Sequence, residues 1–90
     1  MMNVYKYDFR INDYTSVNIP VGSKILKIDG QYNIPQLWAL VDPTNDLEKR
    51  EFRVAGTGHP ISELPDEIEF IDTFQMHDGS LVFHVFELKK

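Results

Sequence analysis

The chain has 90 residues, 42% of them hydrophobic, and a formal net charge of −5. This length predicts one domain, residues 1–90, with a modest core and no deep cleft between two lobes. The absence of cysteine excludes disulfide scaffolds, thiol nucleophiles and cysteine-based zinc sites.

Alternation of apolar and polar residues predicts an extended chain throughout. Strands are expected at residues 4–11, 16–19, 24–29, 36–41, 50–55, 66–75 and 81–88. Asp29-Gly30 and Asp78-Gly79 are hairpin-turn signals, and residues 47–49 suggest one helical turn. The alternation slips near Ile71, which suggests a β-bulge. The fold class is therefore all-β, a small barrel or sandwich of six or seven mostly antiparallel strands.

Two expected strands, residues 36–41 and 81–86, are apolar on both faces. Such strands belong in the middle of a sheet with both sides covered. A 90-residue sheet covers one face by curling onto itself. The second face asks for a second sheet or a second subunit, so we expect a homo-oligomer.

The most function-like stretch is a Gly-Thr-Gly-His loop that follows the strand at residues 50–55. Two glycines permit close backbone approach, so that successive N–H groups can converge on an anion. A nearby arginine pair adds positive charge. The sequence predicts a ligand-binding site at Arg50, Arg53, Gly56, Thr57, Gly58 and His59. The alternative is a glycine turn that merely ends a strand.

Other chemistry-bearing residues give weaker signals. The three histidines, His59, His77 and His84, have no metal-ligand spacing, so we expect no metal site. The carboxylates of residues 66–69 and Asp72 are expected side by side on one solvated acidic face, whereas acid–base catalysis needs two carboxyls across a cleft.

No serine lies in a Gly-x-Ser-x-Gly elbow. We therefore expect that the protein is not an enzyme and that it has neither catalytic residues nor a cofactor. Tyr5, Tyr7, Trp38 and Phe74 are candidates for stacking a nucleic-acid base, although burial in the core is the better interpretation for aromatics in a small β domain. The acidic net charge also argues against a nucleic-acid partner, because phosphate-backbone binding needs clustered lysine and arginine.

Several segments together carry a family resemblance: residues 5–9, 25–26, 37–43, 56–61, 73–75 and 82–87, with Arg50 and Phe52. Through them nearly the whole chain resembles an uncharacterised family of small proteins encoded by phages and prophages. The resemblance implies a phage accessory protein that acts inside the infected bacterium. Small acidic proteins of that kind are often inhibitors of host machinery or host defence.

These observations lead to one functional expectation with two forms. The protein is expected to be a cytoplasmic, non-enzymatic binding protein that counters a host defence system by sequestering a small anionic, nucleotide-type ligand. The alternative is a protein–protein inhibitor that docks a host enzyme through its acidic face. A third, weaker interpretation is a small hydrolase that uses His59. Nucleic acid and membrane are not expected as partners, because the net charge is acidic and no apolar run approaches the length of a membrane span.

Overall fold

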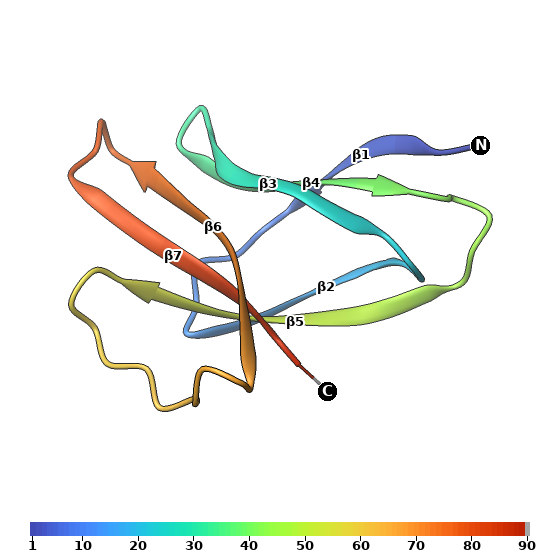
Figure 1. Ribbon diagram of the computed structural model, residues 1–90. Helices are drawn as coiled ribbons and strands as arrows, with labels where there is room; N and C mark the ends of the chain where they lie inside the picture. Colours follow the sequence, from blue (N-terminus) through green and yellow to red (C-terminus); the bar gives the residue numbers. More distant parts are fainter. Residues whose placement is uncertain (90) are drawn as a thin grey trace.

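The computed structural model describes residues 1–89, and all strand pairing in it is antiparallel. The strands are β1 (Asn3–Asp8), β2 (Tyr14–Pro20), β3 (Lys24–Gln31), β4 (Ile34–Val41), β5 (Leu47–Gly56), β6 (Ile68–Met76) and β7 (Leu81–Leu88). They form a three-stranded sheet in the order β1-β4-β3 and a four-stranded sheet in the order β2-β5-β7-β6. The two sheets face each other as an open sandwich (Figure 1). The all-β expectation is confirmed, and the sandwich is the form the chain adopts.

The two tight hairpins differ in how well their turns could be predicted. The turn between β6 and β7 lies at the expected Asp-Gly, where His77, Asp78 and Gly79 all have positive φ. The prediction of a hairpin turn at Asp29-Gly30 is wrong, because both residues belong to β3 and pair with β4. Instead Tyr32 (φ 53°) and Asn33 (φ 61°) form a two-residue turn to β4. Two consecutive residues with positive φ are the signature of a type I′ turn, which suits the right-handed twist of the two strands.

Of two other local predictions, one is wrong and one is confirmed. The helical turn at residues 47–49 is wrong, because these residues begin β5 and pair with β2. Register with the neighbouring strand outweighs their weak helical preference. The bulge near Ile71 is confirmed, since the pairing of β6 with β7 shifts between Phe70 and Asp72.

The core fills the space between the sheets. Its largest fully buried side chains come from both sheets: Phe52, Ile19, Ile28, Leu37, Val41 and Val85. Along one side β3 lies next to β6 (Figure 1). A side chain joins them there, because the backbone N–H of Ile28 donates to Oδ2 of Asp72 at 2.9 Å. Asp72 is thus a structural carboxylate and does not belong to a solvated acidic face.

The strands that are apolar on both faces lie in the middle of their sheets, as expected: β4 between β1 and β3, and β7 between β5 and β6. The segment between β5 and β6 lies against the outer face of β7, where Ile61 and Pro65 share a groove with Phe86. The outer face of β4 is different, because Trp38 and Leu40 there are half-buried among exposed side chains. Oligomerisation stays a prediction, and only β4 still calls for it.

Candidate functional site

The Gly-Thr-Gly-His segment is a tight turn at the end of β5. The His59 N–H donates to the carbonyl of Gly56 at 3.0 Å, and Gly58 has a φ of +87°. Glycine is favoured at that position because a β-carbon clashes in this conformation. The His59 ring folds back over Gly56, where a β-carbon would come within 2.9 Å of Nδ1. Both glycines are explained by the geometry of the turn.

The backbone N–H groups of this turn are used within the protein. The Thr57 N–H donates to the Val82 carbonyl at 3.3 Å, and the His59 N–H is bonded to Gly56. A cradle for an anion needs several N–H groups that point together at the ligand. These two donors are therefore not available for the cradle that the glycine pattern suggested.

A chain of hydrogen bonds fixes the turn to the outer face of the four-stranded sheet. Oγ1 of Thr57 lies 2.7 Å from Nε2 of His84, and Oγ1 of Thr73 lies 3.0 Å from Nδ1 of the same ring. A hydroxyl can both donate and accept, so the two threonines satisfy both ring nitrogens in either neutral tautomer. His84 is therefore a partly buried histidine whose ring nitrogens both have partners within the protein.

Arg53 does not occupy the exposed position that a ligand-binding role requires. The residue is only 7% exposed, beneath the segment that connects β5 to β6. Its guanidinium donates to the carbonyls of Val54 at 2.6 Å, Pro60 at 3.0 Å and Asp13 at 3.2 Å. It also pairs with Glu63 at 3.3 Å and lies 5.1 Å from the centre of the Tyr14 ring. Arg53 is therefore buried, and its contacts to Pro60 and Glu63 fix the loop to the sheet.

Arg50 lies three positions earlier on β5, and so on the opposite face of the strand. It makes a two-pronged ion pair with Glu87 and donates to the carbonyl of Ser23 at 2.8 Å. The hydrogen bond to Glu87 raises the pKa of the guanidinium above its ordinary value, against the opposing effect of burial. The two arginines therefore do not converge on the loop.

The hollow beside the turn is mainly apolar. It has a volume of about 350 Å³ and is lined by Gly56, Thr57, His59 and residues 80–83. Neither lysine nor arginine lines it. Three of the four loop residues of the predicted site, Gly56, Thr57 and His59, thus line one hollow, whereas the two arginines that were expected to supply its charge lie elsewhere.

A second hollow lies on the other side of the same connection, and we call it the loop groove. It has a volume of about 370 Å³ and is lined by Ile61, Glu63, Pro65, Ile68, Phe70 and Phe86. The rings of Phe70 and Phe86 meet edge to face, with centroids 5.8 Å apart. At this surface Phe70 is 57% exposed and Leu64 61% exposed. Large apolar side chains with this much exposure in one place are typical of a protein contact site.

Carboxylates surround the loop groove on the connection itself. Glu63 accepts from the Tyr14 hydroxyl and pairs with Arg53. The Tyr14 hydrogen bond is the main reason that the pKa of Glu63 is lowered from 4.5. Oε1 of Glu67 accepts from the N–H of Leu64 at 2.7 Å, and Asp66 is exposed beside it.

The acidic face expected from the sequence is therefore only partly formed. Glu69 pairs in register with Glu87, on the face of the sheet that also carries Arg50. It thus points away from the loop groove, because Phe70 follows it on the strand. Glu63, which the sequence pattern did not single out, takes its place.

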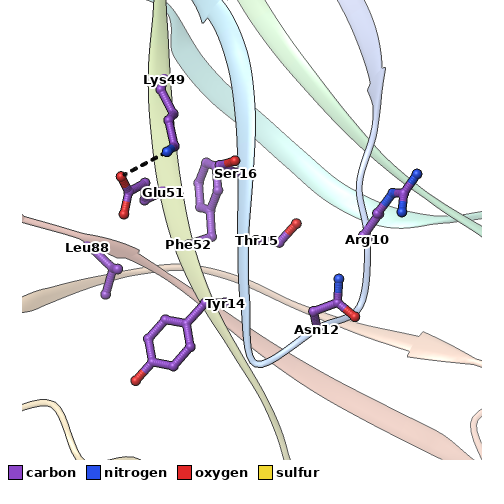
Figure 2. A pocket seen from close by; sticks show the side chains of 9 residues that line it. All are labelled: Arg10, Asn12, Tyr14, Thr15, Ser16, Lys49, Glu51, Phe52 and Leu88. Carbon is purple, nitrogen blue, oxygen red and sulfur yellow. Dashed lines mark ion pairs between the residues drawn. The ribbon is translucent and has the colours of Figure 1, made fainter.

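A third hollow, of about 490 Å³, straddles the edge strand β2. Figure 2 shows Arg10 and Asn12 on one side of β2, with Lys49, Glu51 and Leu88 on the other. Lys49 and Glu51 form an exposed ion pair at 3.9 Å. The charged groups in Figure 2 do not point at a common centre, so the hollow has no arrangement that suggests chemistry.

Within residues 1–89 there is no cluster of three or more histidine, cysteine, aspartate and glutamate side chains suited to a metal ion. The same residues contain no helix long and apolar enough to cross a membrane.

Sequence reasoning placed attention on the glycine turn and missed the loop groove beside it. The available signal was the pair Leu64 and Phe70, which are large apolar residues among Pro65, Asp66 and Glu67. Without the fold, nothing in that pattern separates an exposed leucine from a buried one.

Comparison with known proteins places the chain in a family and goes no further. No curated protein matches the chain, and no solved structure does. A family model described as "Domain of unknown function (DUF7352)" matches residues 1–90. The chain belongs to that family over its whole length.

Proposed function

We propose that this protein is a non-enzymatic binding domain that docks a partner protein through the loop groove. The observation that carries the proposal is a preformed apolar hollow of about 370 Å³. Phe70 in its lining is 57% exposed, and Leu64, between the lining residues Glu63 and Pro65, is 61% exposed. A hollow of this kind accepts one large apolar side chain of a partner. Such anchors supply most of the binding energy at protein interfaces.

The loop groove is held in shape before any partner arrives. Arg53 ties Pro60 and Glu63 to the sheet, and at the other end of the connection the carbonyl of Glu67 accepts from the Lys89 N–H at 2.9 Å. A connection fixed at both ends loses little conformational freedom on binding. Preorganisation of this kind increases affinity because less ordering is left for the binding step.

The charge around the loop groove selects the kind of partner. Asp66 and Glu67 are exposed on the connection that forms one wall, whereas the charge of Glu63 is already paired with Arg53. A partner that places lysine or arginine around its apolar anchor gains complementary charge. Charge of this kind speeds association and makes the affinity fall as salt rises.

The experiment selects ligands for the protein from a library of random peptides displayed on phage. We expect the selected peptides to share one aromatic or large aliphatic residue flanked by lysine or arginine. Phe70→Ala is expected to weaken their binding about 30-fold, because truncation of an interface anchor costs about 2 kcal/mol or more.

Matched controls locate the effect. Leu64→Ser is expected to weaken peptide binding, whereas Leu47→Ser, which alters a comparably exposed leucine at the start of β5, is not. Asp66→Asn is compared with Asp46→Asn in the same way. The proposal would be refuted if the selected peptides bind Phe70→Ala and Leu64→Ser as tightly as they bind the wild-type protein.

A second candidate is sequestration of a small nucleotide-type ligand. The hollow beside Gly56, Thr57 and His59 is mainly apolar and would take the base of such a ligand, whereas no lysine or arginine lines it to meet the phosphate. The phage resemblance would set either function inside an infected bacterium, with a host defence system as the opponent. Native mass spectrometry of protein from infected cells distinguishes the two. A retained ligand that is lost in His59→Ala supports sequestration, and a retained protein that is lost in Phe70→Ala supports docking.

A further inference from the structure

The outer face of the three-stranded sheet gathers positive charge in a protein that is acidic overall. Register places Lys6 and Lys27 directly opposite Trp38, one from each neighbouring strand. The next row pairs Val4 and Lys24 with Leu40. Residues paired across antiparallel strands point to the same side of the sheet. We call these six residues the lysine–tryptophan face.

The lysines of this face keep their charge available. The side chain of Lys24 has no hydrogen-bond or ion-pair partner within residues 1–89. Lys6 donates to the neutral amide of Gln31 at 2.8 Å. Lys27 meets Asp29 at 3.7 Å, but both side chains are well exposed, and exposed pairs of this kind contribute little. The carboxylates of the face, Asp8 and Asp29, flank Gln36 at one end.

The fold thus forms a sheet surface with an aromatic ring in the middle strand and lysines on both sides of it. Single-stranded nucleic acids are recognised on such surfaces, because a base stacks on the aromatic ring while cations follow the phosphates. We propose that the lysine–tryptophan face binds a short single strand of nucleic acid, with a base stacked on Trp38. The acidic net charge argued against this partner, but charge averaged over the chain does not show where the lysines gather.

A second copy of the chain is a poorer occupant for this face. A two-fold symmetric contact would place Lys6, Lys24 and Lys27 of one copy against the same residues of the other. Like charges brought together in this way oppose association. An acidic protein would satisfy the lysines, but it would need an aromatic or arginine side chain at one position to stack on Trp38, whereas every nucleotide of a single strand carries a planar base.

The test uses the intrinsic fluorescence of the protein, because Trp38 is the only tryptophan. A ten-nucleotide oligothymidylate is titrated into the full chain at about 50 mM salt. We expect quenching that saturates, and a salt slope of log K against log salt near −2, since each of three phosphate contacts adds about −0.7 for a single strand. Lys6→Gln and Lys24→Gln are each expected to reduce the slope by about 0.7. Lys49→Gln on the other sheet is expected to change nothing.

A fluorescein-labelled oligothymidylate extends the test to Trp38→Leu, with binding followed by anisotropy. We expect affinity to fall about ten-fold or more, as for loss of one stacked base. The exposed lysine variants keep the proposal testable if Trp38→Leu does not fold. Phe70→Ala is expected to bind the strand normally, so this result is independent of the loop groove.

Four outcomes would overturn the proposal. They are no quenching up to about 1 mM strand, a salt slope that the lysine variants leave unchanged, equal affinity for a glutamate decamer, and sedimentation of a dimer that Trp38→Leu converts to monomer. The third outcome would assign the face to an acidic protein, and the fourth to a second copy of the chain.

Discussion

Replacing Arg53 with methionine removes the guanidinium but keeps an apolar stem of similar length. Arg53 makes hydrogen bonds to three backbone carbonyls and an ion pair with Glu63. A hydrogen bond to a charged group contributes about 1.5–3 kcal/mol. Val54 is buried, so its carbonyl loses that bond without full replacement by water. Pro60 and Asp13 are exposed, and water replaces most of their share.

We therefore expect Arg53→Met to lower the free energy of unfolding by about 3 kcal/mol, which counts the Val54 bond fully and the others in part. For a domain of this size the melting temperature falls by about 12–24 °C. Urea unfolding followed by circular dichroism measures the change. The matched control is Arg10→Met, at an exposed arginine, with an expected change within about 0.5 kcal/mol. A loss of less than about 1 kcal/mol in Arg53→Met would show that Arg53 does not fix the loop.

Three further predictions concern the turn, the acidic rim and the junction of the sheets. Gly58→Ala is expected to lower the free energy of unfolding by about 1–2 kcal/mol, because φ is +87° there; Gly58→Asn should cost less, and equal costs in thermal melts would contradict the backbone argument. Glu63 has a folded pKa lowered from 4.5, so its stabilising contribution is complete at neutral pH and is lost as pH falls through 4.5 and then the folded pKa. Thermal melts from pH 3 to 7 should therefore show that the difference in melting temperature between wild type and Glu63→Gln shrinks only at the acidic end. A difference that stays constant over this pH range would contradict the prediction. Asp72→Ala leaves the buried Ile28 N–H without its acceptor and should cost about 1–3 kcal/mol in urea unfolding. The control Asp46→Ala, at an exposed aspartate, should change the free energy of unfolding by no more than about 0.5 kcal/mol. Similar losses in both variants would count against the junction.

The elements of the fold could be predicted because their signals are local. Alternation marks each strand, and the bulge at Ile71 follows from a slip in that alternation. The turn at Tyr32-Asn33 could not be identified, because neither residue is glycine and Asp29-Gly30 gives a stronger pattern three residues earlier. Tertiary pairing with β4 decides the question.

The candidate site depended on contacts between residues far apart in sequence. Arg50 and Arg53 look alike on one strand, but they face opposite sides and pair with Glu87 and Glu63. Their partners lie 37 and 10 residues away along the chain, and no local pattern gives that pairing. The turn at Gly56–His59 could be predicted from its glycines. Its contacts could not: Thr57 bonds to the Val82 carbonyl and to the His84 ring, and these bonds anchor the loop to β7.

The strand order has a consequence for the way the chain folds. Among the paired strands, only β3–β4 and β6–β7 follow one another in the chain, whereas the β1–β4 and β2–β5 pairs each enclose other strands. Long-range pairing of this kind slows folding to about milliseconds to seconds. We expect the two hairpins to form before β1 and β2 are added to them. The connection over β7 then settles last, so that Arg53→Met should accelerate unfolding and leave the folding rate almost unchanged.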